Sequence, residues 1–288
     1  MDRTSTATAA PAPQKRPQRV QAVLEVQAKT RISPRLLRIR LGGEQFGLLR
    51  RNEHTDSYVK LLLADPSSGL TPPYDLDAIR EAAPEKLPVR RTYTVRRWHA
   101  AEQALDLDVV LHAEEDADGG PRIAGVAARW ADEALPGDRI ALSGAGGGYT
   151  PDPGADRHLL LGDHAALPAV AAALEALPEH ATGTALVHLD HADDALELPH
   201  PAGVELRWVV GEREQLLAEA AALDLSDVSG LQVFCHAERG LTKALRRLLV
   251  TERGVAKEQL SISAYWALGR VEDQFQAEKR EPIGAIDS

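Results

Sequence analysis

Residues 91–96 (Arg-Thr-Tyr-Thr-Val-Arg) carry the side chains of this chain that are best suited to chemistry. Arg91 and Arg96 are permanent cations whose planar guanidinium groups match a pyrophosphate. Tyr93 offers a flat ring for an aromatic cofactor, and Thr94 offers a hydroxyl that can donate to a ring nitrogen. Neighbouring side chains of a flat strand point to opposite faces. Tyr93 and Thr94 could therefore contact the same cofactor only if that cofactor straddled the end of the strand. An exposed strand with solvated arginines is the alternative that this hexapeptide leaves open.

Two further segments carry groups that can bind phosphate. Residues 144–148 (Gly-Ala-Gly-Gly-Gly) resemble a dinucleotide fingerprint, but the Tyr-Thr-Pro-Asp-Pro that follows cannot open the helix such a site needs. We therefore interpret 144–148 as an interdomain turn. Residues 125–130 place small side chains at an expected helix start, where backbone N–H groups and the helix dipole favour an anion. A helix start without a ligand is the alternative there.

Polar residues also follow two apolar runs of the second half. Asp163 and His164 follow one of these runs, and Glu238 follows the other. If both runs are parallel strands, their carboxyl ends form the edge at which such sheets bind ligands.

The composition is typical of a globular protein. Of the 288 residues, 44% are apolar and 26% are charged, which suffices for two domains with sizeable cores. The net charge of −10 argues against non-specific binding to nucleic acid. The single cysteine, Cys235, excludes an internal disulfide and a multi-cysteine metal site, and the histidines lack the spacing of a metal centre.

The first 19 residues are rich in Ala, Pro, Thr and basic side chains. We expect a disordered tail over 1–19, because this segment lacks the apolar stretch of a signal peptide. No run elsewhere is long enough to span a bilayer, so we expect a cytoplasmic protein with no membrane contact.

The pattern changes near residue 150, and we expect two domains, 20–150 and 151–288. The first contains six short, partly alternating runs that predict an antiparallel β-barrel. These runs are 20–26, 36–41, 57–63, 91–95, 105–111 and 139–143. A short helix is expected at 75–83, and a second at 121–131 after a loop at 114–120.

In the second half, short apolar runs alternate with helical segments, which predicts a parallel α/β sheet covered on both faces. The expected strands are 158–161, 185–189, 206–210 and 231–235, and a final strand and helix fall within 261–280. The expected helices are 165–177, 212–223 and 241–252.

Seven blocks in this order resemble the siderophore-interacting protein family, a branch of the ferredoxin-reductase-like flavoproteins that is also called ferric-siderophore reductases. The blocks are 56–61, 91–96, 110–112, 125–131, 146–153, 162–169 and 265–280. The resemblance implies an FAD-binding β-barrel followed by a parallel α/β domain that binds NADH or NADPH.

The resemblance also implies roles for particular residues. Arg91 would hold an FAD phosphate, Tyr93 would pack on the flavin, and Thr94 would contact its redox-active edge. The stretch after His112 would lie along the isoalloxazine. The remaining cofactor contacts implied are Gly125, Ala127, Ala128, Asp163, Glu238 and Trp266.

The implied activity is the passage of electrons from NAD(P)H through FAD to a ferric siderophore or other ferric chelate. Hard oxygen ligands hold Fe(III) far better than Fe(II), so reduction releases the metal without protein iron ligands. Lys60 and Arg129 are the candidates for docking the anionic chelate, and we expect a monomer. The alternative is a flavin-binding protein of the same family with another acceptor or a non-catalytic binding role.

This chain departs from the family pattern at four positions. His164 and Ala165 stand where the family has a carboxylate and a hydroxyl, Ala237 stands for a glycine, and Ala267 stands for an arginine. These departures leave open the use of a nicotinamide nucleotide and the recognition of a siderophore. The choice between NADH and NADPH is open for another reason: Asp190, Asp193 and Asp194 favour a 2′-hydroxyl, whereas Arg207 and Arg213 do not.

Overall fold

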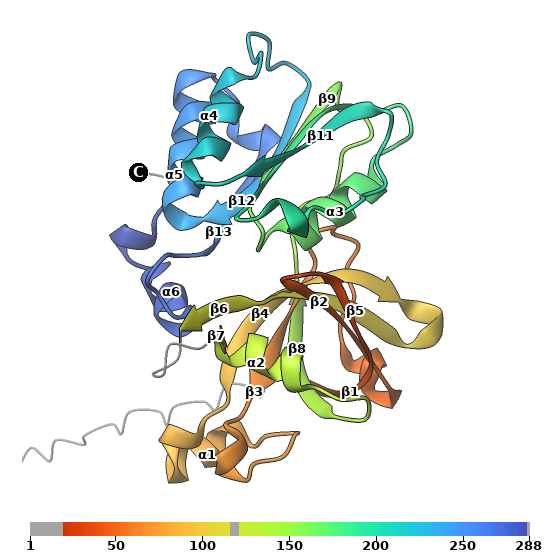
Figure 1. Cartoon of the computed structure of the whole chain (residues 1–288), viewed down its shortest axis with the longest axis vertical. Helices are drawn as coiled ribbons and strands as arrows, with labels where there is room; N and C mark the ends of the chain where they lie inside the picture. The colour runs from red at the N-terminus through yellow and green to blue at the C-terminus, as the bar shows by residue number, and fades with distance from the viewer. Residues whose placement is uncertain (1–19, 116–120, 287–288) are drawn as a thin grey trace, which may run out of the picture.

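A six-stranded antiparallel barrel forms the first half of the protein (Figure 1). The structure, a computed structural model, describes residues 20–115 and 121–286. The barrel closes in the order β1-β2-β5-β4-β3-β8. Its strands are β1 (Gln21–Ser33), β2 (Leu36–Gly42), β3 (Tyr58–Leu63), β4 (Val89–His99), β5 (Ala104–Val110) and β8 (Arg139–Gly146). All six runs predicted as strands are therefore confirmed.

The alternation of β2 and β5 explains why these segments pair as barrel strands. Leucine, isoleucine and valine side chains from alternate positions of both strands fill the barrel core. The positions between them carry opposite charges that meet across the ladder: Arg38 Nε donates to Asp108 Oδ1 at 2.7 Å, and Arg40 Nε donates to Asp106 Oδ1 at 2.8 Å. A one-residue slip would put both sets on the wrong face, so the charge pairs and the apolar face specify one register.

A hairpin and a helix follow the barrel strand β5. The hairpin consists of β6 (His112–Glu115) and β7 (Pro121–Ala124), and the helix is α2 (Val126–Glu133). The predicted helix at 121–131 was thus wrong in its first residues, because 121–124 pair with β6 before the chain turns at Gly125. The predicted loop at 114–120 was wrong at Glu114 and Glu115, and its other residues lie outside the described ones. The helix predicted at 75–83 is confirmed as α1 (Leu76–Ala82).

The second half is a five-stranded parallel sheet in the order β11-β10-β9-β12-β13. Its strands are β9 (Arg157–Gly162), β10 (Thr182–Leu189), β11 (Gly203–Val210), β12 (Leu231–Glu238) and β13 (Leu260–Trp266). From β9 the chain continues to β10 and β11 on one side, and it then returns to β12 and β13 on the other side of β9. The direction in which strands are added therefore reverses between β9 and β12, which are hydrogen-bonded neighbours. The carboxyl ends of these two strands therefore form a topological switch point, the usual ligand crevice of open α/β sheets.

Helices cover both faces of this sheet, as predicted. Helix α3 (Leu167–Ala176) packs on the face that looks toward the barrel, and α4 (Glu214–Ala222) and α5 (Arg239–Arg246) pack on the other face (Figure 1). The last helix, α6 (Glu272–Glu278), leaves the sheet and lies against β4 of the barrel. The chain therefore returns to its first half after completing its second.

The two halves are joined by more than the connecting chain. Gly148 and Tyr149 lie in the connection between β8 and β9. Their backbone N–H groups donate to Oδ1 of Asp56, just before β3, at 2.8 and 2.9 Å. The ring of Tyr149 then packs 4.8 Å from that of Phe234 in the sheet core. No helix follows the glycine-rich segment 144–148, so it is not a dinucleotide fingerprint.

Two sets of ion pairs add to this connection. Ser33 and Arg35 of the barrel hold Asp194, with Arg35 Nη1 at 2.9 Å from Asp194 Oδ2. Glu175 of α3 accepts from both Arg96 and Arg97 of β4. The barrel and the sheet therefore face each other in a fixed orientation.

Two expectations remain predictions. The disordered tail at 1–19 lies outside the described residues, and the domain limits at 150 and 151 stay predictions. Among residues 20–115 and 121–286, no helix has the length and apolar character needed to cross a membrane.

Candidate cofactor and substrate site

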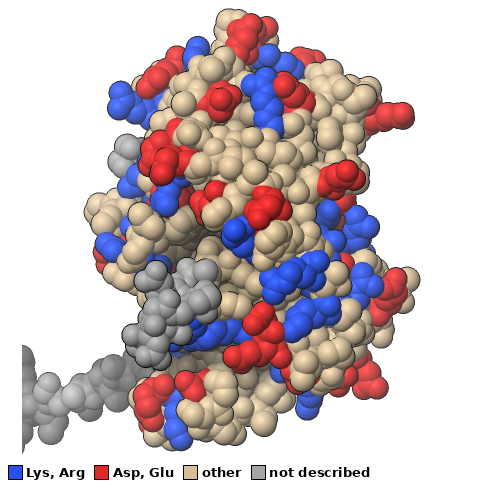
Figure 2. Space-filling view, viewed as in Figure 1, with Lys and Arg blue, Asp and Glu red and all other residues tan. Residues whose placement is uncertain are grey.

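A cavity of about 1200 Å³ lies between the barrel and the carboxyl edge of the sheet. Figure 2 shows the surface hollowed at the junction of the two halves. The barrel contributes β3, β4 and the start of α2, and the second half contributes the ends of β9, β12 and β13 with the segment 267–279. A cavity of this size, with polar groups converging from two sides, is a typical ligand site.

Strand β4 presents a free edge to the cavity. Its residues 89–94 pair with β3, whereas pairing with β5 begins only at Val95. Arg91, Thr92, Tyr93 and Thr94 all line the cavity, since the unpaired edge exposes both faces of the strand to it. The geometric difficulty posed by the sequence, that Tyr93 and Thr94 face opposite ways, is removed in this way.

Arg96 does not share this site. Its side chain is buried, it pairs with Glu175 of α3, and its Nε lies 3.9 Å from Asp108 Oδ2. The interpretation of Arg96 as a pyrophosphate ligand was therefore wrong: this guanidinium joins the two halves of the protein.

The start of α2 offers backbone donors to the same cavity. Gly125 is the N-cap residue, with a φ of 84° that favours glycine, and no side chain caps the helix. Gly125, Ala127 and Ala128 line the cavity, and their small size leaves the first-turn N–H groups within reach of a ligand. An uncapped helix start of this kind suits a phosphate group.

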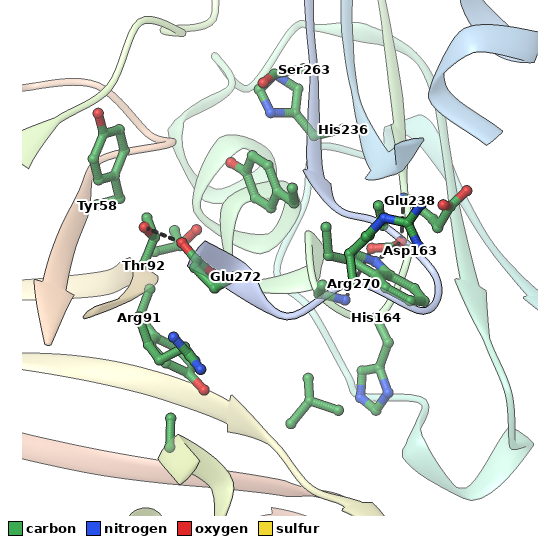
Figure 3. A pocket seen from close by; sticks show the side chains of 18 of the residues that line it. Tyr58, Arg91, Thr92, Asp163, His164, His236, Glu238, Ser263, Arg270 and Glu272 are labelled. Carbon is green, nitrogen blue, oxygen red and sulfur yellow. Dashed lines mark hydrogen bonds between the residues drawn. The ribbon is translucent and has the colours of Figure 1, made fainter. Parts of the chain in front are cut away.

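On the opposite side, Asp163 ties three strand ends together (Figure 3). Its Oδ2 accepts from Trp266 Nε1 at 2.7 Å and from the backbone of Glu238 at 2.8 Å, and its Oδ1 accepts from the backbone of Ala165 and Ala166. Burial raises the pKa of Asp163 above its ordinary value in spite of these donors.

Glu238 is also engaged with the protein. Its two carboxylate oxygens accept from the backbone N–H groups of Leu241, at 3.0 Å, and Leu268, at 3.1 Å. Asp163, Glu238 and Trp266 all line the cavity, but their polar groups mainly hold the walls in place, and their contact with a cofactor stays a prediction.

The sequence analysis gave no role to Tyr265, which lines the cavity. Its hydroxyl is hydrogen-bonded to the Thr94 side chain of the barrel, and burial raises the pKa of the phenol. The His236 ring packs edge-on at 4.8 Å from the Tyr265 ring and stacks on Phe234. Burial lowers the pKa of His236 to about 3, so this ring is neutral at physiological pH. Tyr265 belongs to the block 265–280 that carries the family resemblance, but its contact with Thr94 joins distant segments and no local pattern indicates it.

Basic side chains reach the cavity from both halves. Lys60 lines it, and its role in docking stays a prediction. Lys279, just after α6, lines the cavity too and is close enough to Lys60 to be influenced by its charge. Loss of hydration and Lys60 together lower the pKa of Lys279. Arg129 is not among the residues that line the cavity, and its role in docking stays a prediction.

The four departures from the family pattern occupy different places. His164, Ala165 and Ala267 line the cavity. Ala237 is fully buried in the core beneath α5 instead, with Leu241 and Leu245, so its methyl group does not crowd the cavity.

A closed antiparallel barrel followed by a parallel α/β sheet is the ferredoxin-reductase-like fold. Ferredoxin–NADP⁺ reductase from Plasmodium falciparum has the same fold, with a TM-score of 0.61, 11% identity, and coverage of 85% of this chain and 96% of that one.

The chain belongs to the siderophore-interacting protein family. The model of the siderophore-interacting FAD-binding domain matches residues 25–149, and that of the siderophore-interacting protein matches 155–269. An uncharacterised protein of Mycobacterium tuberculosis is 39% identical over 89% of this chain and 94% of its own. The ferric vibriobactin reductase ViuB of Vibrio cholerae is 30% identical over 89% of this chain and 93% of its own. The siderophore-interacting protein SipS from Aeromonas hydrophila superposes with a TM-score of 0.77 at 27% identity, covering 93% of this chain and 99% of that one.

Proposed function

We propose that this protein is an FAD-dependent oxidoreductase that passes electrons from NADH or NADPH to a ferric siderophore and so releases Fe(II). The observation that carries the proposal is the cavity itself. It brings the free edge of β4 and the uncapped start of α2 to the switch point of a parallel sheet. One side suits a flavin and its phosphates, and the other suits a second nucleotide.

The residues present fit FAD. Arg91 supplies a cation and Tyr93 an aromatic face along the open edge of β4. Thr94 supplies a hydroxyl, which is hydrogen-bonded to Tyr265. When bound, FAD would supply the step between two-electron and one-electron transfer. The work of the protein is to bind, orient and shield, because no group of three or more potential metal ligands occurs among the described residues.

Lys60 and Lys279 support an anionic acceptor. Both line the cavity, and their mutual repulsion is relieved when an anion binds between them. The ferric chelate is the substrate in this proposal, and the reaction would take place in the cytoplasm, where NAD(P)H is available. The cavity is complete within one chain, which agrees with the expected monomer.

The second candidate is a flavoprotein of the same family with another acceptor or with a binding role. Ala267 favours it, because a methyl group lines the cavity where the family pattern has a cation.

Anaerobic mixing separates the two candidates. Purified protein loaded with FAD is mixed with NADH or NADPH, and the bleaching of flavin absorbance is followed. Bleaching by either nucleotide supports the reductase, and no bleaching within minutes rejects it. Photoreduced protein is then given a ferric siderophore and an Fe(II) trap, and the absence of trapped Fe(II) would favour the second candidate.

A further inference from the structure

His164 is a buried side chain without a partner. It follows β9, lines the cavity, and is 8% exposed. Its Nε2 has no hydrogen-bond partner among the described residues. Figure 3 shows the ring lying apart from the Asp163 cluster, where no dashed line reaches it. A buried polar atom left unpaired is costly, so such an atom in a cavity wall indicates a ligand group that completes it.

His164 and the start of α2 line the same cavity. His112 lines it too and lowers the pKa of His164. In the hairpin of β6 and β7, His112 pairs with Ala124, the residue before the N-cap Gly125. His164 from the second half and the uncapped N-terminus from the barrel therefore contribute to one cavity.

The start of α3 has few free backbone donors. The N–H groups of Ala165 and Ala166 already donate to Asp163, Pro168 has no N–H, and the Ala169 N–H donates to the Ala166 carbonyl. The uncapped start of α2 is therefore the better supplied of the two for an anion that meets His164.

The charges that face His164 suit a protonated ring once an anion is present. Asp190 and Asp194 raise the pKa of His164, and His112 and Arg35 lower it, but burial is the largest effect and lowers it overall. Asp194 has the larger of the two carboxylate effects, and Arg35, at 2.9 Å from it, offsets this effect in part, so both carboxylates favour imidazolium. A phosphate brought to the ring would add another negative charge and favour the proton further.

We propose that His164 is a phosphate-binding residue that completes the site at the start of α2 from the other half of the protein, and that its ring takes up a proton when phosphate binds. The inference rests on the proposed binding of FAD and concerns the FAD pyrophosphate. A nicotinamide nucleotide carries the same chemical group, and the experiment distinguishes the two. Binding is tightest where the ring can be protonated and weakens as pH rises through the pKa of the ring in the complex.

Isothermal titration calorimetry of FAD into the FAD-free full-length protein tests the proposal. Titrations in two buffers of different ionisation enthalpy give the number of protons taken up, and FAD itself does not titrate near neutral pH. We expect proton uptake at pH 7 and a dissociation constant that rises by up to about tenfold per pH unit between pH 6.5 and 8. His164→Gln removes the uptake, flattens the pH profile and weakens binding at pH 6.5 by about tenfold.

His180→Gln is the matched control, because this exposed histidine lies beyond the far end of α3 and should leave both results unchanged. Proton uptake that persists in His164→Gln but disappears in His112→Gln would overturn the assignment. So would the absence of uptake by the unaltered protein, a result that needs no variant to fold.

A second titration identifies the source of the phosphate. NAD⁺ is added to the oxidised, FAD-loaded protein, and we expect no difference in proton uptake between His164→Gln and the unaltered protein. Uptake that accompanies NAD⁺ instead of FAD would overturn the assignment to the FAD pyrophosphate. If the unaltered protein binds no FAD, the proposed function itself fails, and this outcome is distinct from FAD binding that ignores His164.

Discussion

The indole Nε1 of Trp266 donates a hydrogen bond to Asp163 Oδ2 at 2.7 Å and so joins the end of β13 to the end of β9. The strand between them, β12, joins the same carboxylate through the backbone of Glu238. One buried side chain therefore sets the positions of three strand ends at the cavity wall.

Replacing Asp163 by Asn should destabilise the protein strongly. In the unaltered protein both carboxylate oxygens of Asp163 accept from N–H donors. The Asn side chain has one acceptor oxygen, so its NH₂ group would face N–H donors that then have no acceptor. We expect a loss of about 3 kcal/mol, seen as a fall of several degrees in Tm. Asp190→Asn, at an exposed position of the same cavity, should change stability by less than about 0.5 kcal/mol. Equal Tm values for the two variants would contradict the proposed role of Asp163.

Arg96 and Arg97 share Glu175 as a partner but differ in exposure, with side chains 6% and 53% exposed. Arg96→Ala removes the buried cation shared by Glu175 and Asp108, leaves each carboxylate with one remaining arginine, and should cost about 3 kcal/mol. Arg97→Ala removes a solvent-screened pair and should cost at most about 1 kcal/mol. Urea denaturation of both variants measures the difference, and a larger loss for Arg97→Ala would show that the connection is assigned to the wrong arginine.

The contact between Asp194 and the barrel should weaken in acid. Burial alone would raise the pKa of Asp194, but hydrogen bonds from Ser33 and Arg35 outweigh burial and lower it. A carboxyl group with a lowered pKa stabilises the fold above its ordinary pKa, and this stabilisation is lost as pH falls through the pKa of the folded state. Asp194→Asn should therefore be less stable than the unaltered protein at pH 7, and the difference in unfolding free energy should shrink at pH 3. A constant difference at both pH values would exclude this linkage.

Arg91→Ala should yield protein that purifies largely without FAD, because the variant lacks the cavity cation on the open edge of β4. The ratio of flavin to protein absorbance measures the occupancy. Arg90→Ala is the control, since its exposed side chain does not line the cavity. Full flavin occupancy in Arg91→Ala would mean that the phosphate lies elsewhere.

Lys60→Ala and Lys279→Ala should each retain FAD but slow the reduction of an anionic ferric chelate by about fivefold at low salt. The effect should diminish as ionic strength rises, because salt screens the attraction. Lys257→Ala, at an exposed position that does not line the cavity, should behave as the unaltered protein. Initial rates with an Fe(II) trap at two salt concentrations provide the measurement, and rates that do not depend on salt would argue against electrostatic docking.

Local patterns in the sequence predicted those parts of the fold that depend on nearby residues. The alternation of Leu and Asp predicts the strand β5, although both of its faces are buried because Arg38 and Arg40 pair with the aspartates. Small residues within 125–128 predict the start of α2. Strand β7 was missed because four residues ending in Ile-Ala fit a helix as well as a strand, and their pairing with β6 decided between them.

The parts of the site that were missed depend on contacts between distant segments. Arg96 faces away from the cavity because Glu175, 79 residues later, accepts its hydrogen bond. Tyr265 and Lys279 reach the barrel only because the chain after β13 returns to β4, where Glu272 accepts from Thr92 across 180 residues. No pattern within a short window of sequence encodes such a return.

The return of α6 to β4 has a consequence for the synthesis of the protein. The barrel strands leave the ribosome before Tyr265, Glu272 and Lys279 do. One wall of the cavity is therefore missing from a nascent chain that has already exposed its barrel strands. The cavity is closed only when translation has passed residue 279, so a cofactor that needs both walls would be retained by chains that include this residue and released by shorter ones.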